Sequence, residues 1–335
     1  MKLPVYLAGL FGLSVATGLI AWQGFAVMFE ALAVAGWGLV VVALFHFIPQ
    51  LADNLGWRLL VLPSPRPSLY SLTWIRWIRE AVDALLPVAQ IGGKLVGIRL
   101  LMLHRISGAA AGSSVVVELT LSVITQLLFT LIGLGLLLLL TRNNAVSFGV
   151  LAGVAVGSVG VVGFIFVQRR GLFATLLKWL SAMTGGERWI SLVGGAARLD
   201  EAIQLLYRRR ATLFYSGVWQ FLAWMLGTGE VWLALYFLGH PVSIMEALFL
   251  ESLGQAIRSA GFSIPGSLGV QEGGYMVLGT VLGLSPETGL ALSLAKRVRE
   301  LLLGIPALIT WQWLEGRRFW SSRGEQTRTD TAPIE

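Results

Sequence analysis

The 335-residue sequence contains no cysteine and only three histidines. Without cysteine, the chain can form no disulfide, thiol nucleophile or thiolate metal site. Three scattered histidines do not supply a metal cluster, so we expect neither a bound metal nor a cofactor. Charged residues are also scarce, at 13% of the chain against about 25% in soluble domains. A soluble fold is therefore excluded.

Catalytic signatures are missing as well. The sequence has no G-x-S-x-G elbow, H-E-x-x-H pair or Walker A loop, so we expect no enzyme and no nucleotide-binding domain. One alternative stays open, because Ser267 lies in Pro-Gly-Ser-Leu-Gly, one residue off the elbow spacing. An intramembrane hydrolase would pair Ser267 with His46 or His240.

Long apolar stretches dominate what is present, with 56% hydrophobic residues and a mean hydropathy of +0.75. Apolar segments of about 20 residues cross a bilayer as helices, because lipid satisfies no backbone hydrogen bond. The sequence therefore predicts an all-α integral membrane protein with about six transmembrane helices. The predicted spans lie near residues 5–22, 36–60, 108–140, 146–168, 211–238 and 286–314.

The net charge of +7 comes from basic residues in short connections and not from one soluble face, so no nucleic acid partner is expected. Lysine and arginine cluster in residues 58–105, 169–210 and 317–323. Because basic loops stay in the cytoplasm, both termini are predicted to be cytoplasmic. We expect one membrane domain, residues 1–315, followed by a polar tail, residues 316–335.

Two segments, residues 68–105 and 243–284, do not fit as simple spans. Each is moderately apolar, is broken near its centre by proline and glycine, and begins and ends on one side of the membrane. They predict two re-entrant helical hairpins. In the first, Arg76 and Arg79 lie largely away from the apolar side, so this helix could lie in the membrane interface.

The hairpins predict an internal repeat. Aligning Pro87 with Pro265 places Glu80 opposite Arg258, and the same register places Glu118 opposite Lys296. The halves are then residues 36–140 and 211–314, joined by an amphipathic cytoplasmic linker of residues 169–210. The predicted architecture is an inverted repeat, in which broken helices form a substrate site near the midplane.

Ionisable residues inside apolar spans are costly and are default site candidates. If the halves face each other, the opposite charges of Glu118 and Lys296 are expected to meet near the midplane. Two interpretations stay open, structural ion pairs that fix helix register and a hydrophilic path for an anionic head group. The predicted substrate path comprises Glu80, Asp83, Pro87, Gly92, Gly93, Arg99, Glu118, Arg258, Pro265, Gly266, Gly269, Glu272, Gly273, Lys296, Arg297 and Glu300. A secondary polar stripe comprises His46, Gln50 and Asp53.

The hairpin motifs resemble those of a known family, the lysylphosphatidylglycerol synthase transmembrane, or flippase-like, family. The similar motifs are Glu80-x-x-Asp83-x-Leu-Leu-Pro87 followed by Gly92-Gly93, and Ile264-Pro265-Gly-Ser-Leu-Gly269-Val-Gln-Glu272-Gly273. The resemblance covers roughly residues 5–315. Residues 77–93 are further similar to the hopanoid biosynthesis-associated membrane proteins within that family.

The resemblance implies a bacterial inner-membrane protein that moves a membrane lipid, hopanoid or phospholipid-like, between leaflets. The best-known member fuses such a region to an aminoacyltransferase, whereas this chain ends in a short polar tail, so we expect no aminoacylation. The leading prediction is a lipid flippase or transporter with its cavity between the hairpins. The alternative from another class is a scaffold that recruits lipid-synthesis enzymes through residues 169–210.

Overall fold

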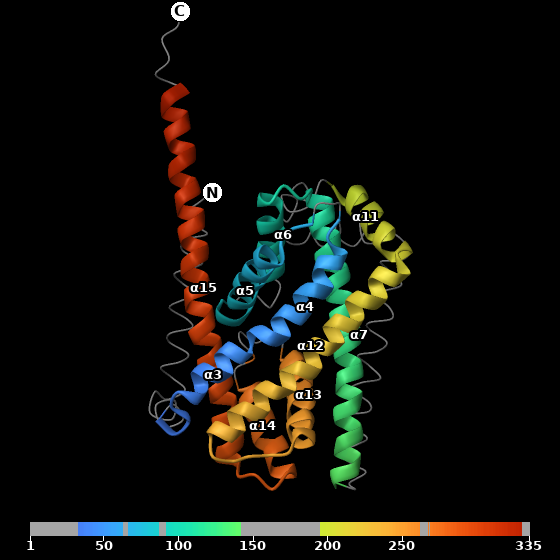
Figure 1. Cartoon of the computed structure of the whole chain (residues 1–335), viewed down its shortest axis with the longest axis vertical. Helices are drawn as coiled ribbons and strands as arrows, with labels where there is room; N and C mark the ends of the chain where they lie inside the picture. The colour runs from blue at the N-terminus through green and yellow to red at the C-terminus, as the bar shows by residue number, and fades with distance from the viewer. Residues whose placement is uncertain are drawn as a thin grey trace, which may run out of the picture.

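The computed structural model describes residues 33–62, 66–86, 92–141, 195–261, 267 and 269–329. These residues form ten helices and contain no strand, which confirms the all-α prediction (Figure 1). The helices are α3 (Gly38–Phe45), α4 (Phe47–Leu60), α5 (Leu69–Leu85), α6 (Gly92–Leu103), α7 (Gly108–Thr141), α11 (Ala196–Arg208), α12 (Arg210–Phe237), α13 (Ile244–Ala260), α14 (Val270–Val281) and α15 (Pro286–Thr329). Outside the described residues lie the predicted spans 5–22 and 146–168, linker residues 169–194, tail residues 330–335, and Pro87, Pro265 and Gly266.

The distribution of polarity is that of a membrane protein. Large apolar side chains face outward, with Trp37 86% exposed and Val277 65% exposed. Ionisable side chains are buried instead, with Glu118 3% and Lys296 1% exposed. A soluble protein buries its apolar groups and almost never fully buries lysine or glutamate. The outer surface is therefore suited to lipid.

Two described segments are long and apolar enough to cross a bilayer. They are Gly38–Leu60, with 23 residues and a mean hydropathy of 1.4, and Gly108–Leu139, with 32 residues and a mean hydropathy of 2.2. They coincide with two of the predicted spans. Helices α12 and α15 cover two more predicted spans but are not in this apolar group.

The linker is amphipathic where it is described. Helix α11 buries Leu199, Ile203 and Leu206 and packs against α7, whereas Arg198 and Glu201 are exposed. The described part of the predicted linker is therefore an amphipathic helix.

Each predicted hairpin consists of two short helices. Helices α5 and α13 have 17 residues each, and α6 and α14 have 12 residues each. At 1.5 Å per residue these lengths are about 26 Å and about 18 Å, less than the roughly 30 Å of a hydrocarbon core. The pair α5 and α6 lies toward one end of the molecule, and the pair α13 and α14 lies toward the other (Figure 1).

The turns that follow the two hairpins repeat each other at a separation of 178 residues. Arg105 and Gly283 both have a positive φ, 64° and 76°. In each turn, the N–H of the positive-φ residue and the N–H of the residue before it both bond to carbonyls three residues earlier. The N–H of the next residue bonds to a carbonyl five residues earlier. Ser107 and Ser285 then accept hydrogen bonds from the N–H three residues later, at the start of α7 and α15. The register that places Glu118 opposite Lys296 is therefore confirmed.

The first helices of the hairpins follow a different register. Ser68 and Ser243 cap α5 and α13 in the same way, and these equally long helices are separated by 175 residues. The difference arises because nine residues connect α13 to α14, whereas six connect α5 to α6. The prediction that Glu80 lies opposite Arg258 is therefore wrong, and the caps place Arg258 opposite Asp83.

The two halves interleave. Helix α5 of the first half packs against α15 of the second, and α13 of the second half packs against α7 of the first. Helices α4 and α12 pack together between them (Figure 1). This arrangement surrounds one central space with side chains from both halves.

Glycine allows α14 to approach α15 closely, and α5 to approach α6 closely. A Cβ on Gly289 of α15 would lie 2.4 Å from the Tyr275 carbonyl oxygen of α14. A Cβ on Gly93 of α6 would lie 2.3 Å from the Arg79 carbonyl oxygen of α5. These contacts are with backbone, which cannot rotate away, so a side chain would force the helices apart.

We expect Gly289→Ala to lower the free energy of unfolding by about 1 to 3 kcal/mol, the usual cost of forcing extra atoms into a packed contact. Gly217→Ala on α12 is the matched control, because its Cβ would meet no atom within 4 Å. Denaturant unfolding in detergent micelles, followed by tryptophan fluorescence, measures both. Equal stability of the two variants would contradict the close α14–α15 contact.

Candidate functional site

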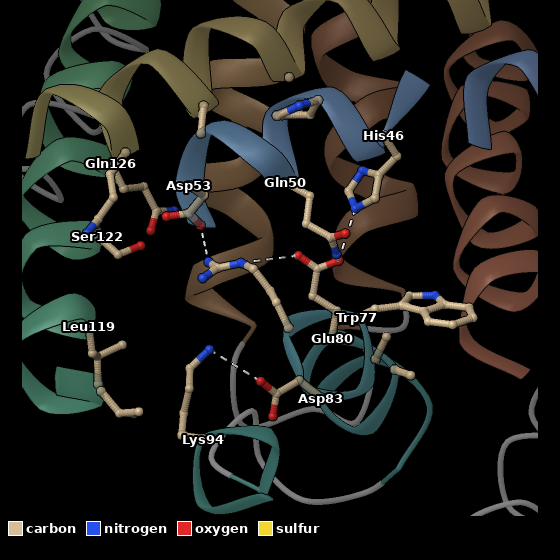
Figure 2. Close-up of a pocket in the computed structure, with 18 of the residues that line it drawn as sticks. His46, Gln50, Asp53, Trp77, Glu80, Asp83, Lys94, Leu119, Ser122 and Gln126 are labelled. Atoms are coloured by element: carbon tan, nitrogen blue, oxygen red, sulfur yellow. Dashed lines mark hydrogen bonds and ion pairs between the residues drawn. The ribbon is translucent and has the colours of Figure 1, made fainter. Parts of the chain in front are cut away.

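A cavity of about 1120 Å³ lies between the two halves. Pockets for drug-sized ligands usually measure about 300 to 1,000 Å³, so this one admits a larger molecule. Polar side chains from α4, α5, α12, α13 and α15 line the cavity, and α6 and α7 contribute both polar side chains, such as Lys94 and Gln126 (Figure 2), and many of the apolar ones. The apolar side chains of α6 and α7 are Leu95, Ile98, Met102, Leu103, Val115, Val116, Leu119 and Val123. The cavity is therefore amphipathic.

Three helices of the first half contribute a charge cluster that we call the first triad, Asp53 of α4, Arg76 of α5 and Glu118 of α7. Arg76 donates from Nη1 to Glu118 Oε1 at 2.9 Å and from Nη2 to Asp53 Oδ2. Arg79 donates to Glu118 Oε2 at 2.8 Å, and its guanidinium lies 4.5 Å from the centre of the Trp57 ring. Both carboxylate oxygens of Glu118 are thus neutralised, as a buried charge requires.

The second half contains the second triad, Glu230 of α12, Glu251 of α13 and Lys296 of α15. Lys296 Nζ donates to Glu251 Oε2 at 2.5 Å and lies 3.8 Å from Glu230 Oε1. The Tyr275 hydroxyl lies 3.4 Å from the same oxygen of Glu251. All three members of the triad are buried.

The two triads occupy equivalent helices, but the cation lies on α5 in the first triad and on α15 in the second. The registers place Arg76 opposite Glu251 and Glu118 opposite Lys296. Each triad therefore has two carboxylates and one cation, with the cation on the hairpin in the first half and on the long helix in the second. The expectation that Glu118 and Lys296 meet is wrong, because each is bonded within its own half.

His46 connects the two halves. It lies between α3 and α4, where Pro49 has no N–H to continue the helical hydrogen bonds. Its Nε2 is 3.0 Å from Glu80 Oε2 of α5, and its Nδ1 is 2.8 Å from Glu230 Oε2 of α12. The same Nδ1 is 2.7 Å from Arg299 Nη1 of α15. One imidazole therefore contacts three other helices, and Figure 2 shows the contact with Glu80 of α5.

A further network ties α13, α14 and α15 together. Arg258 Nη1 donates to Glu300 Oε1 at 2.5 Å, and Arg297 donates to Glu300 Oε2 at 3.2 Å. Arg297 Nε also donates to Glu272 Oε1 at 3.1 Å, and Glu272 Oε2 accepts from the Gly269 N–H at 2.7 Å. The start of α14 is thus held by a carboxylate of the protein.

The start of α6 is held in the same way. Asp83 accepts from the Gly93 N–H at 2.8 Å and lies 3.4 Å from Lys94 Nζ (Figure 2). Helix N-termini favour anions, and the anionic head group of a lipid is one ligand that such a site suits. In the structure, Asp83 and Glu272 bond to the backbone there instead.

The structure brings eight of the twelve predicted polar residues to the cavity. Those that line it are Glu80, Asp83, Arg99, Arg258 and Glu300 of the predicted path, with His46, Gln50 and Asp53 of the secondary stripe. Those that do not line it are Glu118, Lys296, Arg297, Glu272, Gly92, Gly93, Gly269 and Gly273. The first three support cavity residues through ion pairs.

Five charged residues of the cavity wall were missed by sequence reasoning, namely Arg76, Lys94, Glu230, Glu251 and Arg299. Arg76 was assigned to the membrane interface together with Arg79, but the two residues are 8% and 2% exposed. Glu230 carried a usable signal, because a single carboxylate in an apolar span requires a partner.

The serine alternative is not supported by the geometry. Ser267 Oγ donates to the carbonyl oxygens of Arg258 at 3.0 Å and Gly261 at 3.3 Å, and its side chain is buried. His46 is bonded to the groups described above, and His240 is exposed. Among the described residues, no group of three or more histidine or carboxylate side chains is placed to hold a metal ion.

A family model described as the lysylphosphatidylglycerol synthase TM region matches residues 9–307. The match includes both halves, both triads and the linker. No curated protein and no solved structure matches the chain.

The different position of the cation in the two triads predicts how exchanging the charges of Arg76 and Glu118 affects stability. Arg76→Glu or Glu118→Lys alone should lower the free energy of unfolding by about 3 to 5 kcal/mol, because each leaves like charges buried together. The double variant should recover part of this loss, because it restores one ion pair in the order of Glu251 and Lys296 but leaves buried Arg79 beside the new lysine. A double-mutant cycle of unfolding measures the coupling, and additive losses would contradict the equivalence of the triads.

Proposed function

This chain belongs to the lysylphosphatidylglycerol synthase transmembrane family, and from that premise we propose that it is a transporter that moves a membrane lipid between leaflets. The observation that carries the proposal is a single cavity with charged and apolar parts. A lipid has the same two parts, a polar head group and acyl or ring carbons. The charged part would hold the head group while the α6 and α7 side chains cover the hydrocarbon.

The charges on the wall favour a head group with little net charge. The wall has five cationic side chains, Arg76, Lys94, Arg99, Arg258 and Arg299. It has six carboxylates, Asp53, Glu80, Asp83, Glu230, Glu251 and Glu300. A nearly balanced wall suits hydroxyls or a zwitterion better than an isolated phosphate, so a hopanoid or a phospholipid-like lipid is our proposed cargo. The proposal includes no catalytic step.

The proposed topology has about six spans, with the two hairpins entering the membrane from opposite sides. The short lengths of their helices support this, since none spans a hydrocarbon core. The turn after α6, helix α11 and the far end of α15 all lie toward one end of the molecule (Figure 1). The turn after α6 contains Arg105, α11 ends in the run Arg208–Arg210, and the far end of α15 contains Arg317 and Arg318, so we assign that end to the cytoplasm of a bacterial inner membrane.

Leaflet exchange in proteoliposomes tests the function. The protein is reconstituted in phosphatidylcholine vesicles with a trace of acyl-labelled fluorescent phosphatidylcholine, a zwitterionic probe, and dithionite quenching reports the outer-leaflet fraction over time. We expect exchange well above that of empty vesicles. Exchange equal to that of empty vesicles, for this probe and for a hopanoid extracted with the protein, would overturn the proposal.

A matched pair of variants tests the cavity. Ala223→Trp on α12 fills the cavity wall and should slow exchange at least several-fold. Leu222→Trp adds the same ring on the neighbouring exposed position outside the cavity and should leave exchange unchanged. Equal rates for these two variants would place the path elsewhere.

A further inference from the structure

The contacts of His46 require two protonation arrangements. Its Nδ1 lies within hydrogen-bond distance of both Glu230 Oε2, an acceptor, and Arg299 Nη1, a donor. A ring nitrogen that carries a proton can donate to Glu230 but cannot accept from Arg299, and without the proton the reverse holds. Only one of these two hydrogen bonds can therefore exist at a time.

The other ring nitrogen has no such conflict. Nε2 faces Glu80 Oε2 at 3.0 Å, and Gln50 Nε2 donates to the same oxygen at 3.0 Å. Because Glu80 is an acceptor, Nε2 carries a proton in both arrangements. The proton that comes and goes is therefore on Nδ1.

Among the described residues, three helices present charged side chains to His46. Helix α12 presents Glu230, α5 presents Glu80 with Arg76 3.9 Å from that carboxylate, and α15 presents Arg299. Lys296 of α15 reaches the site only through Glu230. Glu118 of α7 bonds instead to Arg76 and Arg79.

From this geometry we propose that His46 is the proton-binding site through which the protein couples lipid movement to a proton gradient. The proposal rests on the proposed transport function. In the empty form, Arg299 donates to Nδ1 and Glu230. When cavity water delivers a proton, an N–H bond forms at Nδ1 and donates to Glu230, and the same proton later returns to water.

Binding of the proton displaces Arg299 from Nδ1, and this displacement reaches the second hairpin. Arg299 Nη2 lies 3.5 Å from Glu300 Oε1, and that oxygen accepts from Arg258 of α13. His46 itself lies at the break between α3 and α4, where the helix has fewest internal bonds. A proton at Nδ1 therefore alters contacts in both halves at once.

Nitrogen-15 NMR tests proton binding without transport. The chain has three histidines, so His104→Gln with His240→Gln leaves His46 as the sole labelled imidazole. Both replaced residues are exposed. In nanodiscs between about pH 5 and pH 8 we expect Nδ1 to change from protonated to unprotonated while Nε2 keeps its proton. A single protonation state across this range would overturn the proposal.

Transport with a pH gradient tests the coupling. Using the phosphatidylcholine vesicles and acyl-labelled fluorescent phosphatidylcholine described above, a gradient of one pH unit should change the exchange rate several-fold for wild type and for His240→Gln. It should have no effect on His46→Gln, in which the amide keeps a donor toward Glu80 but cannot gain a proton. His46→Asn, with its amide toward Glu230, should behave in the same way.

The outcomes separate the two proposals. Exchange by wild type that ignores the gradient, or a gradient response that survives in both His46 variants, would overturn the coupling and leave the transport function standing. No exchange by wild type for any probe would overturn both. A folded His46→Gln is verified by an unfolding midpoint close to that of His240→Gln.

Discussion

The cost of ionised groups in a low-dielectric interior governs this structure. A buried charge without a partner costs several kcal/mol, so each buried carboxylate of the triads must meet a cation at short range. The helices cannot slide or rotate independently, because Arg76 joins α4, α5 and α7 while Lys296 joins α12, α13 and α15. Charge pairing thus fixes the helix register that apolar contacts with lipid leave free.

The same constraint explains how two halves with dissimilar sequences share one architecture. What they have in common is a set of backbone features, including the turns at Arg105 and Gly283 and the serine caps that follow. The two triads have the same net charge, although different residues occupy their equivalent positions. His46 then bonds across the halves and makes the central cavity depend on both.

Much of the fold could be predicted from the sequence because its signals are local. The continuous apolar runs of α7 and of α3 with α4, and the proline and glycine breaks of the hairpins, identified helices directly. The register of Glu118 and Lys296 was also available, since nothing is inserted between the hairpin centres and these residues. The register of Glu80 was not, because the three-residue difference lies inside the hairpin connection. The partners of Arg76 and Arg299 could not be predicted either, because they depend on how helices distant in sequence pack.

The concentration of charge on α15 has a consequence for biogenesis. Lys296, Arg297, Arg299 and Glu300 occupy little more than one helical turn, and each would cost about 2.5 to 3.5 kcal/mol at the centre of an isolated helix on insertion scales. This helix cannot partition into lipid alone. Its partners Glu230, Glu251 and Arg258 all precede it in the chain, so they leave the ribosome first. When α15 is synthesised, the partners of its charges are therefore already present, and the order of synthesis allows these charges to be paired as soon as the helix forms.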